Sequence, residues 1–175
     1  MSDEIAHLRE QLRSLTERVA ALEETGHASN QESALDEGGF WALNGLQARL
    51  PDDASTVEGA VMLVGALTLP TGAPVSWQQT VGTAGQIETT WAERAAVFAS
   101  LGHPVRLELL RHILAGTHAT SELAAIDGLG TTGQLHHHLR QLVSAGWVRQ
   151  SGRGSYEVPA TRIMPLLACM LGAER

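Results

Sequence analysis

The chain lacks lysine, has a single cysteine and contains few aromatic residues. All twelve basic residues among its 175 residues are arginine, and aromatic residues make up only 4%. Because Cys169 stands alone, an intramolecular disulfide framework is excluded. We read the absence of lysine mainly as a coding bias, although arginine also suits bidentate contacts with phosphate.

Long apolar runs are absent as well. No run approaches the roughly 18 residues that a membrane-spanning helix needs, and the acidic N-terminus is unlike a signal or transit peptide. The sequence therefore predicts a cytoplasmic protein with no membrane partner. Hydrophobic residues still make up 43% of the chain, which is enough for a core in one ordinary domain or two small ones.

Negative charge is concentrated in the first half of the chain. The net charge is −7, and residues 1–40 hold nine acidic residues against three arginines. Residues 91–175 instead hold six acidic residues and eight arginines. The whole-chain charge argues weakly against nucleic acid as a partner, but the C-terminal half has the opposite sign.

The N-terminal segment, residues 1–25, has the apolar spacing of a coiled coil. Apolar residues recur at intervals of three and four, and charged residues fill the other positions. Three heptads need a partner helix, most simply the same helix of a second copy, and the alternative is a helix packed on the chain's own body. The predicted seam is Ile5, Leu8, Leu12, Leu15, Val19 and Leu22.

A polar linker, residues 26–39, leads to a small segment at 40–89. The sequence "FWALNGLQARLP" predicts a short helix before Pro51. Strand-like runs at 61–69 and 75–81 flank a turn and predict a β-hairpin, which must pack on another element. Trp41, Trp77 and Trp91 could line a ligand pocket, but a core role is the more frequent one for such residues.

Residues 90–175 carry most of the functional signal. One helical pattern runs from about Thr90 to before Pro104, a second ends at Gly116, and a third, with Thr120 or Ser121 as its N-cap, ends near residue 126. Another helix runs from about 131 to Gly146, and its buried face is expected to carry Leu135, Leu139, Leu142 and Val143. Two short strands around "SGRG" and a final apolar helix at about 160–171 follow. This order predicts a mainly α fold with small β elements (α+β), in which a winged helix-turn-helix carries a recognition helix at 131–145.

Three adjacent histidines, His136 to His138, at first suggest a metal site. Successive helix residues point about 100° apart, so these side chains cannot all bind one ion. No histidine stands four residues from this run, as a helical chelate requires. We expect no metal and no cofactor, with His138 partly inward and the other two facing DNA.

The stretches "ASLGHPVRLELLRHIL", "TSELAA", "GQLHHHLRQLVSAGWV" and "SGRGSYEV" together resemble the ArsR family of winged-helix transcriptional regulators. The resemblance covers about residues 91–172. It implies sequence-specific binding to double-stranded DNA as a homodimer, usually with repression, and a dimerisation helix at the C-terminus.

The resemblance and the polar face of the helix together give the candidate residues. The predicted DNA contacts are Thr131, Thr132, Gly133, Gln134, His136, His137, Arg140, Arg149 and Arg153. The last two lie in the wing at 147–158, which is expected on the DNA backbone or in the minor groove. The predicted dimerisation residues of the last helix are Leu166, Leu167 and Met170.

The chain departs from the family where metal sensing would occur. "TSELAAI" carries no cysteine, and "TRIMPLLACMLGAE" carries neither the Asp nor the His ligands that other members use. A lone cysteine on an apolar helix is more often a small buried hydrophobe than a redox switch. Regulation would therefore lie in the first 90 residues, which fall outside the family pattern.

Three functions remain open at this stage. The leading hypothesis is a DNA-binding regulator that is a dimer, or a tetramer if both ends associate separately. The second is a sensor in which residues 40–89 bind a small molecule or a protein effector, and the third is a winged helix that docks protein. We expect no enzymatic activity, because phosphate-binding, nucleophile-elbow and metal-hydrolase motifs are missing.

Overall fold

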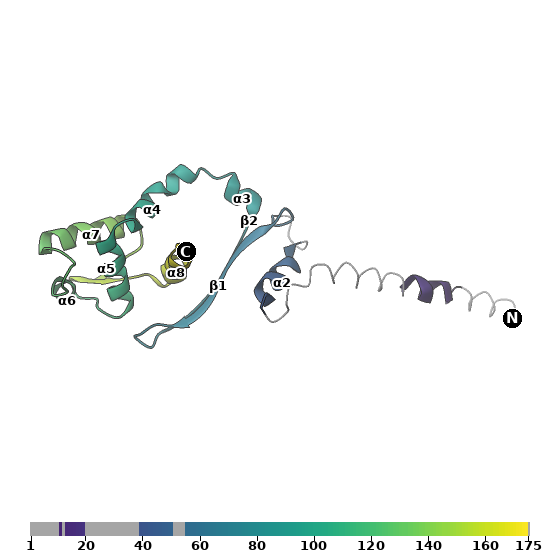
Figure 1. Ribbon diagram of the computed structural model, residues 1–175, viewed down its shortest axis with the longest axis horizontal. Coiled ribbons are helices and arrows are strands. Elements are labelled where there is room, and N and C mark those ends of the chain that lie inside the picture. Colours follow the sequence, from purple (N-terminus) through teal and green to yellow (C-terminus); the bar gives the residue numbers. More distant parts are fainter. Residues whose placement is uncertain (1–10, 12, 20–38, 51–54, 175) are drawn as a thin grey trace. The chain divides into compact units, whose positions relative to one another are not determined.

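The computed structural model describes residues 11, 13–19, 39–50 and 55–174 (Figure 1). Contacts divide the chain into two compact units, Met1–Asp53 and Ala54–Arg175. In the first unit, residues 11 and 13–19 are helical, and helix α2 spans Trp41–Gln47. The short helix expected before residue 51 is therefore present, although residue 51 itself lies outside the described residues.

The second unit is mixed α+β and begins with a long hairpin. Strand β1 (Ala60–Thr68) pairs antiparallel with β2 (Pro74–Gly82) over their full lengths. The turn closes through the amide of Leu69, which donates to the carbonyl of Ala73 at 2.9 Å. The predicted hairpin is thus confirmed, and each of its four strand ends lies one residue from the predicted position.

This hairpin packs on the C-terminal helix α8 (Ala160–Gly172). Gly65 of β1 faces Met164 so closely that an added Cβ would come within 2.5 Å of the methionine side chain. Leu69 and Val75, on either side of the turn, pack against the main core. Since a lone two-stranded hairpin is marginal in water, α8 supplies the apolar partner that it needs.

Short helices connect the hairpin to the rest of the unit. The stretch expected as one helix from Thr90 begins instead as a 3-10 turn and continues as a helix to Leu101. In chain order the elements are α3 (Thr83–Ile87), the 3-10 helix Trp91–Arg94, α4 (Ala95–Leu101), α5 (Pro104–Leu114), α6 (Thr120–Ala124), α7 (Thr132–Ser144), β3 (Arg149–Gly152), β4 (Ser155–Glu157) and α8.

Leucines from α5, α6 and α7 form the centre of the core. Leu109, Leu123, Leu135 and Leu139 have no exposed surface. Trp147, which is 3% exposed, extends this core toward α4 because its indole Nε1 donates to the carbonyl of Val97 at 3.1 Å. The core therefore joins helices that lie far apart along the chain.

Two local expectations are wrong. Val143 was expected on the buried face of its helix, but its side chain is 41% exposed. Successive helix residues point about 100° apart, so the burial of Leu142 does not extend to Val143. Helix α6 begins after Ala119 and is not capped by Thr120 or Ser121. The Thr120 hydroxyl donates instead to the carbonyl of Gly154 at 2.8 Å, so a tertiary contact replaces the cap.

None of the described helices combines the length and the apolar composition needed to cross a membrane.

Candidate nucleic-acid interface

Helix α7 has one buried apolar face and one exposed polar face. Leu135, Leu139 and Leu142 are fully buried against the core that α5 and α6 share with α7. Their spacing of four and three residues keeps them on one side of the helix. The opposite side is therefore fixed toward solvent by the burial of the leucines.

The N-terminus of α7 is closed by a capping box. The Thr131 hydroxyl accepts from the amide of Gln134 at 3.4 Å, and the Gln134 side-chain oxygen accepts from the amide of Thr131 at 2.8 Å. Two of the amides that a helix start leaves unpaired are thereby satisfied. Both residues were predicted to contact DNA, and both are exposed, but this hydroxyl and this amide oxygen also hold the helix start.

The remaining predicted residues of α7 all lie on its exposed side. Within the described part of the chain, Arg140 and His136 have no ion pair or hydrogen bond, so their polar atoms face solvent. Adjacent side chains diverge along a helix, and His138 is accordingly only half-buried between the two faces. The exposed residues are Thr131, Thr132, Gly133, Gln134, His136, His137 and Arg140.

His138 turns toward the start of α5. Its ring centroid lies 4.6 Å from that of His103, which caps α5 by accepting from the amide of Val105 at 3.2 Å. Burial lowers the pKa of His138 below its ordinary value of 6.5, and the nearby His103, Arg106 and His137 lower this pKa further. The expected inward direction of His138 is thus observed, but its neighbour is a second histidine ring.

The β3–β4 hairpin, which the sequence predicts as the wing, is tied to the segment before α6. The His118 carbonyl accepts from the Tyr156 amide at 2.9 Å, and the Thr120 amide donates to the Gly154 carbonyl at 2.8 Å. A single bridge also joins Ala119 to Ser155. These contacts place residues 118–120 alongside β4 and hold the hairpin against the start of α6.

The two arginines of the β3–β4 hairpin differ in their surroundings. Arg149 forms an ion pair with Glu157 across the hairpin, with its Nε 2.6 Å from the carboxylate Oε1. Arg153 lies at the exposed turn beside Gly154, whose φ of +70° favours glycine. No ion pair or hydrogen bond engages the Arg153 side chain in the part of the chain that the structure describes, so its charge is the less compensated of the two.

Several positioning residues were missed by sequence reasoning. His118 contacts the carbonyl of Tyr156 through Nδ1 at 2.8 Å, and Arg162 lies over the ring of Trp147 at 5.3 Å. Arg106 donates from Nε and Nη2 to the carbonyls of Ser100 and Ala99, which end α4. These contacts join residues six or more positions apart along the chain. The spacing of apolar residues in the sequence gives no information about such contacts.

The predicted dimerisation residues differ in their exposure to solvent. Leu15 and Val19 are 54% and 50% exposed, while the other four seam residues lie outside the described residues. In α8, Leu166 is 2% exposed and belongs to the core, whereas Leu167 and Met170 are half-buried. Leu171, which was not among the predicted residues, is 70% exposed.

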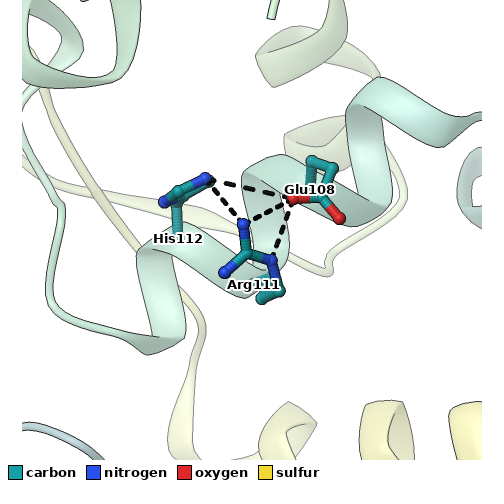
Figure 2. A network of polar contacts seen from close by, with 3 residues as sticks. All are labelled: Glu108, Arg111 and His112. Atoms are coloured by element: carbon teal, nitrogen blue, oxygen red, sulfur yellow. Dashed lines mark hydrogen bonds and ion pairs between the residues drawn. The ribbon is translucent and has the colours of Figure 1, made fainter. Parts of the chain in front are cut away.

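A groove of about 330 Å³ runs between α5 and α8. Its rim carries an ion pair in which Arg111 Nη2 lies 2.6 Å from Glu108 Oε2, with His112 Nε2 at 3.0 Å from the same nitrogen (Figure 2). The hydrogen bond from Arg111 lowers the pKa of Glu108. The apolar lining is Leu107, Leu110, Leu114, Leu166, Leu167 and Met170.

A second cavity of about 300 Å³ lies beside Trp91 and Phe98, with Gln86 and Arg94 also in its wall. The Trp91 indole donates to the carbonyl of Gln86 at 2.8 Å. Trp91 is the one of the three predicted tryptophans that lines this cavity, and Trp77 is half-buried in β2.

Within the described ranges, no three His, Cys, Asp or Glu side chains gather closely enough to hold an ion.

Comparison with known proteins gives no relative. No family model, no curated protein and no solved structure matches this chain.

Proposed function

We propose that the chain is a transcriptional regulator that binds specific sequences in double-stranded DNA as a homodimer. Helix α7 enters the major groove, and the β3–β4 wing contacts the backbone or the minor groove. In this proposal residues 90–175 are a winged helix-turn-helix of the kind found in the ArsR family, and binding represses transcription.

One observation carries this proposal. A helix whose buried face is all leucine presents His136, His137 and Arg140 to solvent, and the hairpin that follows it along the chain exposes Arg153 at its turn. Histidine, glutamine and arginine side chains donate and accept hydrogen bonds at base edges and phosphates. A recognition helix needs this combination, because the buried face fixes the register in which the polar face meets the groove.

Apolar surfaces support the dimeric part of the proposal. Leu15 and Val19 continue a coiled-coil spacing and are exposed, and Leu167, Met170 and Leu171 line one side of α8. Exposed apolar residues in such rows are typical of association surfaces. Use of one row gives a dimer, and separate use of both gives a tetramer.

Fluorescence anisotropy is the direct test. The full-length protein is titrated onto labelled duplexes tiled across the DNA upstream of its own coding sequence, beside a scrambled duplex of the same composition, at several salt concentrations. We expect one tile to bind at least about a thousandfold more tightly than the scramble. Affinity for both should fall steeply with salt, because arginines that neutralise phosphates release counterions.

Equal affinity for all tiles and the scramble would leave a non-specific binder and refute sequence reading. Absence of binding to any duplex, even at low salt, would refute the DNA-binding proposal. The alternative of a winged helix that docks protein would then become the leading one.

A second candidate function is effector sensing. The cavity beside Trp91 is close to the segment expected to sense a ligand, and a ligand there would contact both α4 and the residues after α3. It could change DNA affinity only by binding the two states of the protein unequally. Small aromatic and carboxylate compounds that quench Trp91 fluorescence in wild type but not in Phe98→Ala would support this candidate, and an unchanged spectrum across the set would oppose it.

A further inference from the structure

The contact between His138 and His103 joins α7 to the start of α5. The two ring centroids lie 4.6 Å apart at a tilt of 42°. His138 Nδ1 is buried and has no hydrogen-bond partner in the described part of the chain. A neutral imidazole can leave this nitrogen as an unused acceptor, but the protonated ring carries an N–H at both nitrogens. The buried N–H would then lack an acceptor.

The groups that face His138 all oppose a positive charge. Arg106 of α5 cannot easily turn away, because it is held by the carbonyls of Ala99 and Ser100. His103 is the N-cap of α5, and His137 belongs to α7 itself, with its ring centroid 5.6 Å from that of His138.

The other packed elements supply no compensating anion. Helix α4 (Ala95–Leu101) contains no charged residue. Helix α6 contains Glu122, but its carboxylate faces the amide of Ala119 at 3.4 Å and so serves its own helix. Addition of a proton at His138 is therefore resisted by burial and by its neighbours together.

We propose that the His103–His138 contact is an acid-sensitive junction, and that protonation of His138 weakens the packing of α7 on α5. A neutral His138 allows α7 to pack on α5, and a protonated His138 opposes this packing because its buried Nδ1 hydrogen lacks an acceptor and Arg106 lies nearby. The regulatory consequence, a loss of DNA affinity in acid, rests on the proposed function, whereas the effect on folding does not.

The sign of the pH dependence follows from linkage. Folding lowers the pKa of His138 below the value of 6.5 that applies to the unfolded chain. The unfolded state therefore binds this proton at a higher pH than the folded state does. The contribution of His138 to stability is fully present above about pH 6.5 and is lost progressively as the pH falls through and below that value.

The test compares urea unfolding of the full-length wild type and His138→Phe between pH 7.5 and pH 5.5. Phenylalanine keeps an aromatic ring against His103 but cannot be protonated. The acidic residues and the histidines that do not contact His138 contribute equally to both proteins, so the ratio of the unfolding constants isolates His138 and its contacts with neighbouring rings. We expect the wild-type constant to rise at least about threefold more than the variant's over this range.

Two further variants sharpen the comparison. His103→Asn retains an N-cap side chain for α5 and removes the second ring, so it should reduce the pH dependence without abolishing it. His136→Gln removes an exposed histidine of the same helix and should leave the pH dependence of stability at the wild-type value. Equal pH dependence in wild type and His138→Phe would overturn the proposal.

A direct titration covers the case in which His138→Phe does not fold. Imidazole ¹⁵N signals of the folded wild type should place the His138 midpoint below that of histidines in the urea-unfolded chain, and a midpoint at or above it would overturn the proposal. DNA binding is a separate arm. If the linkage is found but no duplex binds, the acid-sensitive junction stands and the proposed function falls.

Discussion

Thr131 illustrates how much one side chain can do at the start of α7. Its hydroxyl accepts from the amide of Gln134, and that residue's amide group returns the contact. Thr132, the next residue, is exposed and takes no part in this capping box. Two neighbouring threonines with similar exposure therefore have different structural roles.

We predict that Thr131→Ala lowers the free energy of unfolding by about 1 kcal/mol, because an amide at the helix start loses its acceptor. Thr132→Ala is the matched control and should change stability by no more than about 0.5 kcal/mol. Urea unfolding at pH 7.5 measures both. Equal losses for the two variants would show that the cap contributes nothing special.

Arg153 and His136 separate two kinds of DNA contact under the proposed function. Arg153→Ala should weaken binding to the specific and the scrambled duplex by a similar factor and reduce the salt slope by about 1, since it neutralises phosphate. His136→Gln should instead change preference among sequences, at about 1–3 kcal/mol for a good base contact. Anisotropy titrations with both duplexes distinguish the two effects.

Arg149 is a poorer probe because its removal would also leave Glu157 without its ion pair. An equal loss on both duplexes for His136→Gln would contradict a base-reading role for that residue.

At the scale of elements, α7 is fixed by its leucine face. Leu139 is fully buried, whereas Val143, one turn further along the same helix, is 41% exposed. Burial therefore changes from complete to partial between two side chains only one helical turn apart. Its N-terminal half, which carries the histidines, is held by the same leucines that fill the core.

Leu139→Ala should lower the free energy of unfolding by about 2–5 kcal/mol, because it removes a fully buried side chain and leaves a cavity. Val143→Ala, the control on the same helix, should cost about 0.5 kcal/mol. Thermal or urea unfolding gives both values. A large loss for the valine variant would mean that its exposed surface is covered, which self-association could do.

At the scale of the whole molecule, the proposal requires association. The described part of the N-terminal helix exposes Leu15 and Val19 at spacing typical of a seam. Ser14 is exposed beside them but lies off that seam. The two positions therefore test the seam without a truncation.

Leu15→Glu should lower the molar mass of the full-length protein in solution, because a charge in the seam opposes helix pairing. Ser14→Glu adds the same charge off the seam and should leave the mass unchanged. Light scattering coupled to size-exclusion chromatography at micromolar concentration measures both. A wild-type protein that runs as a monomer would refute the seam and the dimer together.

Local pattern predicted a large part of the second unit. The leucine spacing of α7, Gly146 after its end, and the turn before Pro74 each depend on a few adjacent residues. The class of fold, mixed α+β, followed from the order of such segments. The exposed polar residues of α7 followed as well, since they are opposite the leucines.

Tertiary packing decided what these patterns could not. The hairpin needed an apolar partner, but only the folded chain brings Met164 against Gly65. The pairing of His103 with His138 and the anchoring of Trp147 to Val97 join residues more than thirty positions apart. The sequence alone therefore determined the elements and their polar faces, because these depend on local spacing. The tertiary structure determined which buried groups meet, because that depends on how the chain closes on itself.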